Sequence, residues 1–219
     1  NMLSGYSEPA GWNKLIVAPI WIRDRFIEMI DREKQHAAEG KPARIVAKMN
    51  SLCDKKIIEK LYEAAAAGVK IDLIIRGICC LKVGIPGVSE NITVRSIVGN
   101  FLEHSRIFYF YNNGREDVFM GSADWMPRNL DKRVEIVFPV EDEACKAEVT
   151  EVLKIQLEDN VKAHILQADG SYEKVDKRGK TLISSQDYFC KKAKERAKTE
   201  KNEDETPSRV FEPLYKAEE

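Results

Sequence analysis

Apolar and polar positions alternate along the first third of the chain in a pattern that predicts strands and helices in turn. Short apolar runs, typical of buried strands, occur at residues 15–19, 43–49 and 69–75. Between them, apolar residues recur at helical spacing, which predicts amphipathic helices over residues 24–40 and 54–67. This order, with short links, predicts parallel strands joined by right-handed crossovers.

The middle and the end of the chain follow a different pattern, in which strands come one after another. Four further strands are expected, at residues 94–98, 105–111, 117–120 and 134–140. The sequence Asn112-Asn113-Gly114 predicts a hairpin turn between the second and the third of them. A helix over residues 142–158 and a small hairpin across Asp169-Gly170 are expected to follow.

Composition separates the body of the chain from its ends. Residues 1–12 are polar and are interpreted as a linker or a cut edge, and charges dominate from residue 191. We therefore expect one α/β domain over residues 13–165, an extension of it over 166–190, and a charged tail over 191–219 that is either helical or disordered.

Charge and cysteine content restrict the class of protein. The chain has 35 Lys and Arg against 36 Asp and Glu, so no basic excess favours nucleic acid as a partner, and an anionic ligand must meet a local positive patch. No apolar run approaches the roughly 20 residues that span a bilayer. The five cysteines lack metal-ligand spacing, which predicts reduced thiols, no structural zinc and a cytoplasmic location, with attachment to a membrane surface as the alternative.

Histidine is the first candidate for chemistry, because the chain has only three. His36 lies in the polar end of a predicted helix and His164 in a weakly patterned region, so surface and structural roles are expected for them. His104 stands at the start of a predicted strand, with Arg106 two residues further on the same strand face. An imidazole beside a guanidinium can act on a phosphoryl group as a nucleophile, an acid or a base.

Two other groups of polar residues follow apolar strands. Strand ends at residues 48–50 and 76–77 are where ligands of a parallel sheet bind, so Lys48 and Arg76 are candidates. Arg76 needs either a ligand or a carboxylate partner. The segment 121–133 could bind an anion through Ser122, Arg128 and Asn129, with Asp124 orienting an arginine or an imidazole, or it could be a polar turn capped by Asp124 and Asp131.

Several long motifs carry a family resemblance. His104-Ser-Arg106 followed by Gly121-Ser-Ala-Asp124 resembles one half of the phospholipase D motif, with Arg106 in place of lysine and Tyr111 in place of an acidic residue. Five longer runs resemble, in order, the C-terminal catalytic region of long-form polyphosphate kinases, with the likeness spanning residues 13–190: 75–81, 84–92, 95–99, 101–106 and 121–135.

This resemblance implies a phospholipase D-like mixed sheet flanked by helices, with a short C-terminal extension. It implies a kinase that transfers the terminal phosphoryl group of ATP reversibly to inorganic polyphosphate with Mg²⁺, through a phosphohistidine in the preceding domain. In that reading Arg76 contacts the nucleotide and His104 is the acid or base. Lys48, Ser122, Arg128 and Asn129 are then the other candidate phosphate ligands, Asp124 and Arg106 support them, and no metal ligand is assigned to this chain.

Further expectations concern partners and alternatives. The partners implied are ATP or ADP, polyphosphate, the N-terminal half of the enzyme and, at full length, further copies of it, and the isolated chain is expected to be inactive. The rival reading is a phospholipase D-type phosphodiesterase or phosphatidyltransferase with His104 as the covalent nucleophile. A third reading is a nucleotide- or polyphosphate-binding module without catalysis.

Overall fold

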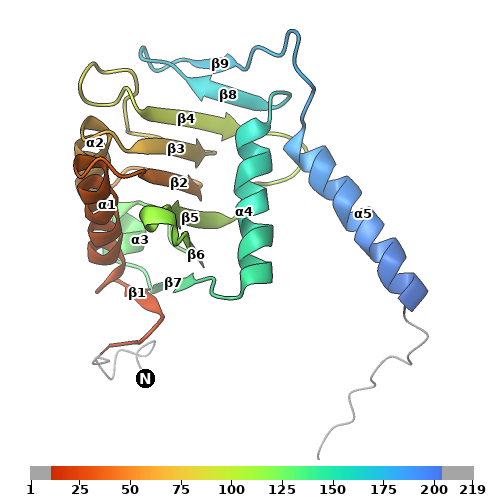
Figure 1. Cartoon of the computed structure of the whole chain (residues 1–219), viewed down its shortest axis with the longest axis horizontal. Coiled ribbons are helices and arrows are strands. Elements are labelled where there is room, and N and C mark those ends of the chain that lie inside the picture. Colours follow the sequence, from red (N-terminus) through yellow and green to blue (C-terminus); the bar gives the residue numbers. More distant parts are fainter. Residues whose placement is uncertain (1–10, 204–219) are drawn as a thin grey trace, which may run out of the picture. The chain divides into compact units, whose positions relative to one another are not determined.

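A single mixed sheet organises the computed structural model, which describes residues 11–203 (Figure 1). Within that range the strand order is β1-β7-β6-β5-β2-β3-β4-β8-β9. The strands are β1 (Ile16–Ala18), β2 (Arg44–Met49), β3 (Lys70–Ile75), β4 (Ile92–Ile97), β5 (Arg106–Phe110), β6 (Asp117–Gly121), β7 (Glu135–Pro139), β8 (Ala163–Leu166) and β9 (Tyr172–Lys174). The helices are α1 (Ile22–Ala38), α2 (Lys55–Ala66), η1 (Asn112–Gly114), α3 (Pro127–Asp131), α4 (Glu143–Glu158) and α5 (Ser185–Glu203).

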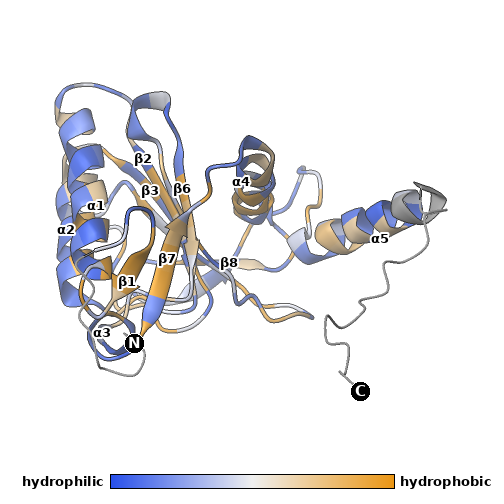
Figure 2. Ribbon diagram, turned by 90° about the horizontal axis from the view of Figure 1, so that it is seen from below, coloured by the Kyte–Doolittle hydropathy of each residue, from blue (hydrophilic) through white to orange (hydrophobic). Residues whose placement is uncertain are grey.

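Helices cover both faces of the sheet, which confirms the predicted α/β class. Figure 2 shows α1 and α2 on one face and α4 on the other. The larger core lies under α1 and α2, where Trp125 packs against Phe26 and Phe108 with ring centroids 5.3 Å away in each case. A smaller core, which includes Leu153 of α4, fills the opposite face. Trp125 lies in the segment that follows β6, next to Asp124, so this packing fixes the position of the polar residues in that segment.

The predicted parallel unit is only partly correct. Strands β2, β3 and β4 do pair in parallel, but β1 pairs antiparallel with β7 at one edge of the sheet. Because β7, β6 and β5 alternate in direction between them, β1 still runs the same way as β2. The sequence pattern predicts the direction of a crossover but not how many strands it passes, and here strands from later in the chain occupy the gap.

Local signals in the sequence account for several element ends. Asp54 caps α2 as predicted, since its carboxylate accepts a hydrogen bond from the Ile57 N–H at 3.1 Å. Gly68 follows this helix with a φ of 102°, a conformation that glycine adopts readily. The predicted hairpin turn is confirmed as η1 between the antiparallel β5 and β6. Helix α3 was not predicted, although Pro127 at its first turn is a recognised signal.

The C-terminal region continues the sheet before the chain leaves the first compact unit. Strands β8 and β9 form the predicted small hairpin, and β8 pairs with β4. Within residues 11–203, contacts divide the chain into two compact units, one that ends at Ser185 and one that begins at Gln186. The charged segment from residue 191 is helical as far as the description goes, and the rest of the predicted tail lies outside the described residues. No helix within residues 11–203 is long and apolar enough to cross a membrane.

Strand directions bring the candidate residues to one edge of the sheet. Strands β2, β3 and β6 end at this edge, and the antiparallel β5 begins there. The pairing of Met49 with Ile75 places Asn50 beside Arg76 just beyond the strands. Strand β5 flanks β2 on its other side, so His104 and Arg76 are separated by the width of one intervening strand, on the order of 10 Å between backbones.

Candidate functional site

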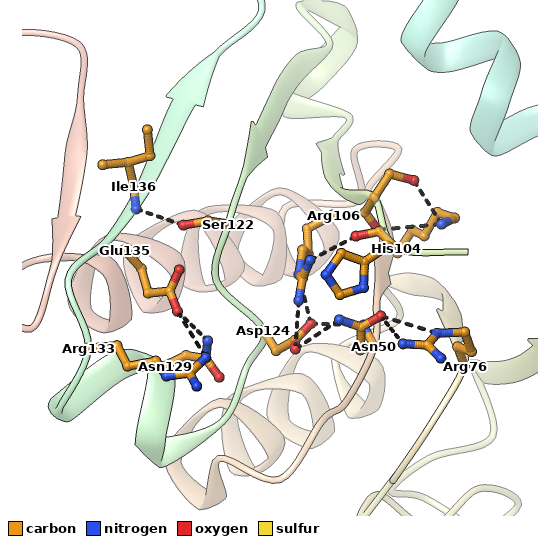
Figure 3. Close-up of polar contacts among 12 residues, drawn as sticks. Asn50, Arg76, His104, Arg106, Ser122, Asp124, Asn129, Arg133, Glu135 and Ile136 are labelled. Atoms are coloured by element: carbon orange, nitrogen blue, oxygen red, sulfur yellow. Dashed lines mark hydrogen bonds and ion pairs between the residues drawn. The ribbon is translucent and has the colours of Figure 1, made fainter. Parts of the chain in front are cut away.

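Asp124 is the centre of a polar cluster at this edge, here named the Asp124 cluster, which comprises Asn50, Arg76, His104, Arg106 and Asp124 (Figure 3). The buried Asp124 carboxylate accepts hydrogen bonds from the Asn50 backbone N–H at 2.8 Å and from its Nδ2 at 3.2 Å. It also accepts from Nε and Nη2 of Arg106, at 3.1 and 3.2 Å. Asp124 thus contacts an arginine, one of the two groups that the sequence suggested it could orient, and the negative charge of its carboxylate is compensated within the cluster.

Arg76 is held by an amide and not by a carboxylate. Its Nε and Nη2 donate to the Asn50 Oδ1 at 3.2 and 2.8 Å. Across the described part of the chain, no ion pair of the half-buried Arg76 is found. A neutral amide orients a guanidinium without cancelling its charge, so Arg76 retains a net attraction for an anion. Of the two alternatives that the sequence left open, the geometry favours a ligand.

His104 lies in the loop before β5 with an exposed side chain. Arg106 ties this residue to the Asp124 cluster, because its Nη1 donates to the His104 carbonyl oxygen at 2.8 Å. The imidazole itself forms no hydrogen bond with the described residues, and Figure 3 shows it at the same edge as Arg106, Asn50 and Arg76. An exposed imidazole beside guanidinium groups is free to exchange a proton with a bound anion.

Lys48 lies below this edge and not on it. Its side chain is only 2% exposed, and its Nζ is 2.8 Å from the Ser105 Oγ and 3.3 Å from Oε2 of Glu103. Burial lowers the pKa of Lys48, while the Glu103 carboxylate opposes that shift. In this position the ammonium group contacts protein groups, so its predicted role as a phosphate ligand gives way to a supporting one.

A second group of polar residues, here named the Glu135 cluster, consists of Ser122, Asn129, Arg133 and Glu135. Asn129 is buried, and its Nδ2 donates to Oε1 of Glu135 at 2.5 Å. The Ser122 N–H, expected to face an anion, donates instead to the Ile136 carbonyl at 2.9 Å. Its exposed hydroxyl accepts from the Ile136 N–H at 3.1 Å and still has a proton to donate.

The remaining candidates divide between open and enclosed positions. Arg128, on the short helix α3, is exposed. His164 lies in β8, in line with its expected structural role. His36 differs from expectation, because both its ring nitrogens are buried and have no hydrogen-bond partner among the described residues. Within residues 11–203 no group of three or more His, Cys, Asp or Glu side chains is arranged to hold a metal ion.

Sequence reasoning missed the residues that hold the candidates in place. Asn50 joins Asp124 to Arg76, and Glu103 and Ser105 hold Lys48. The signal available for Asn50 was its position directly after a buried strand that contributes to a ligand edge. No sequence signal pointed to Glu103 or Ser105, apart from their place on either side of His104.

Together, the fold and this edge define an α/β domain that presents two kinds of anion-directed group, guanidinium and imidazole, beyond the ends of its central strands. The sequence model described as "Polyphosphate kinase C-terminal domain 2" matches residues 15–186. The chain therefore belongs to the polyphosphate kinase C-terminal domain 2 family, as the sequence motifs indicate.

Individual relatives agree with this assignment. The chain is 56% identical over 172 residues to a polyphosphate kinase of Thermosynechococcus vestitus, covering 78% of this chain and 24% of the relative. It is 55% identical over 194 residues to that of Staphylococcus epidermidis, covering 88% and 26%. The crystal structure of polyphosphate kinase from Porphyromonas gingivalis superposes with a TM-score of 0.85 at 39% identity, covering 90% of this chain and 30% of that one. The chain thus spans about a quarter of the length of these curated relatives.

Proposed function

We propose that this chain forms part of the site at which a polyphosphate kinase transfers the terminal phosphoryl group of ATP reversibly to inorganic polyphosphate. The observation that carries the proposal is that an exposed His104 and Arg76, a guanidinium oriented by an amide, lie at the same edge of the sheet. Membership of the polyphosphate kinase C-terminal domain 2 family supports the choice of reaction.

The chemistry proposed for these residues is positioning, charge neutralisation and proton transfer. The transfer breaks the bond between the γ-phosphorus and the oxygen that bridges it to the β-phosphate, and ADP leaves with that oxygen. The phosphoryl group passes to a histidine outside this chain and then to the terminal oxygen of polyphosphate. His104 donates a proton to the leaving oxygen or takes one from the attacking oxygen, a role that typically contributes about 10²–10⁴ in rate.

Phosphate binding is assigned to the side chains that remain open. Arg76 contacts the nucleotide phosphates, and the exposed Arg128 and the Ser122 hydroxyl contact further phosphate oxygens. Arg106 and Asp124 hold the edge in shape. Lys48 and Asn129, which the sequence also suggested as ligands, are buried and act as supports.

Mg²⁺ is part of the proposal because polyanionic phosphates are handled with it. Asp124, the carboxylate at the centre of the Asp124 cluster, is already engaged by Asn50 and Arg106. Since no metal-binding group is arranged within residues 11–203, we assign no Mg²⁺ ligand to this chain and derive no step through the ion. The role proposed for this chain rests on Arg76, Arg128 and His104.

The rest of the enzyme is the principal partner proposed, because the chain spans only about a quarter of its relatives. We propose a cytoplasmic enzyme that forms homo-oligomers at full length, and attachment to a membrane surface stays a weaker alternative. The isolated chain is expected to bind ATP or polyphosphate weakly and to turn over neither, because the phosphohistidine lies elsewhere.

A comparison of the full-length enzyme with a deletion variant and with the isolated chain tests the proposal. ATP-dependent synthesis of polyphosphate, followed with γ-labelled ATP, would be measured for the full-length kinase, for the same kinase lacking residues 13–190, and for the isolated chain. We expect synthesis only in the first. Robust synthesis by the isolated chain would show that the phosphohistidine is misplaced, and synthesis by the deleted enzyme would show that this edge is not needed. Release of a phosphodiester hydrolysis product would favour the phospholipase D-type reading instead.

A further inference from the structure

Lys48 is an unusual residue to find in the interior, and its contacts converge on the segment that carries His104. We infer that Lys48 is a positioning residue, which holds His104 in place by binding the residues on both sides of it. The catalytic meaning of this inference rests on the proposed function, whereas the contacts themselves do not.

The evidence is the set of bonds made by one ammonium group. The Lys48 Nζ donates to the Ser105 Oγ at 2.8 Å and lies 3.4 Å from the Ser105 carbonyl oxygen. It forms an ion pair with Oε2 of Glu103 at 3.3 Å. Glu103 and Ser105 are the immediate neighbours of His104, so the backbone of that residue is fixed before and after it, while its imidazole stays exposed.

Helix α4 supports the same segment from the face of the sheet opposite α1 and α2. The Nε2 of Gln156, a residue 2% exposed, donates to Oε2 of Glu103 at 2.7 Å. The backbone carbonyl oxygen of Gln156 accepts a hydrogen bond from the Nη1 of Arg95 on β4 at 3.4 Å. The carboxylate of Glu103 therefore binds groups from both β2 and α4, which ties the loop that carries His104 to these two elements.

A ligand role for Lys48 is excluded by its position. With 1% of the residue exposed, the ammonium group cannot reach an anion bound at the surface without displacing Ser105 or Glu103. Burial of a charge is costly, and apolar residues of similar size often replace buried ion pairs without loss of stability. The specific benefit of lysine here is geometric, because an apolar side chain would make neither contact.

The test uses the three histidines as internal reporters in the full 219-residue chain. In side-chain NMR spectra of histidine-labelled protein, Lys48→Met should shift or broaden the His104 imidazole signals and leave those of His36 and His164 unchanged. The matched control is Lys60→Met, which removes a surface lysine of α2 paired with Asp31 and Glu63. This control should leave all three histidines unchanged.

Kinetics in the full-length kinase provide the second readout. A displacement of about 1 Å at a reacting group can cost up to about 10²-fold in rate. Lys48→Met should therefore lower kcat by about 10- to 100-fold and change the KM for ATP by less than about threefold, whereas loss of a nucleotide contact raises KM. Ser105→Ala, which removes only the hydroxyl, should give a smaller change of the same kind and serves in place of Lys48→Met if that variant does not fold.

The outcomes separate this inference from the proposed function. Unchanged His104 signals in both Lys48→Met and Ser105→Ala would overturn the positioning role. The positioning role would also be overturned if Lys48→Met folds and keeps the parent kcat in a kinase whose His104→Ala variant is inactive. Parent-level activity of His104→Ala would instead defeat the proposed function itself.

Discussion

Two polar clusters lie at the same edge of the sheet, and they differ in whether every charged side chain has a partner of opposite charge. Hydrogen bonding in the Glu135 cluster is not complete, because the buried Asn129 Oδ1 has no partner among the described residues. In the Glu135 cluster, Asn129 binds Glu135 and the Ser122 N–H binds a strand carbonyl. In the Asp124 cluster, bonding is complete at the centre but ends outward in an exposed imidazole and in Arg76, which has only an amide partner. Polar residues with internal partners stabilise the fold, whereas those left without an opposite charge are available to a ligand.

The largest expected effect comes from His104→Ala in the full-length kinase. Because the exposed imidazole makes no contact that the fold requires, the variant should fold normally yet lose about 10²–10⁴ of kcat. Initial rates of polyphosphate synthesis and a thermal melt would measure both properties. His164→Gln, in β8, is the matched control. Parent-level synthesis by His104→Ala would remove the distinction between the two clusters, since His104 of the Asp124 cluster would then have no chemical role.

Arg76→Ala is expected to act on binding more than on the chemical step. Hydrogen bonds to a charged group contribute about 1.5–3 kcal/mol, so the KM for ATP should rise by about 10- to 100-fold with a smaller change in kcat. The control is Arg178→Ala, since that exposed arginine pairs with Asp176 two residues away. An unchanged response to ATP would mean that Arg76 is a structural residue held by Asn50.

The substitution Asn129→Leu tests whether the Glu135 cluster stabilises the fold. Loss of its Nδ2 leaves the buried Glu135 carboxylate without that donor, which should cost about 1–3 kcal/mol in the free energy of unfolding. Urea denaturation of the 219-residue chain measures this loss, and the KM for ATP of the full-length enzyme should stay near the parent value. A large rise in the KM for ATP without loss of stability would restore Asn129 as a phosphate ligand and contradict the structural role of the Glu135 cluster.

The sequence was sufficient to find the elements and the edge, but not the partners of each side chain. Arg76 could be placed at this edge because it follows an apolar run, and the carboxyl ends of parallel strands lie at one edge of a sheet. His104 stands before its strand, and it reaches the same edge because β5 runs antiparallel to β2. The contacts of Lys48 could not be predicted, because Glu103 and Ser105, which bind it, come from a loop far along the chain. The neighbour of β1 could not be predicted for a similar reason, since β7, with which it pairs, is more than a hundred residues away.

The smallest effect is expected for Ser122, which, like Arg133, is an exposed member of the Glu135 cluster. Its hydroxyl accepts a bond from the Ile136 N–H, so only its remaining proton is available to a phosphate oxygen. A neutral hydrogen bond contributes about 0.5–1.5 kcal/mol, and Ser122→Ala should therefore raise the KM for polyphosphate by about two- to tenfold. Ser122→Thr, which keeps the hydroxyl, should restore most of the affinity. If Ser122→Ala lowers only the melting temperature and leaves this KM unchanged, the whole Glu135 cluster is structural, and phosphate contacts at this edge belong to Arg76, Arg128 and His104.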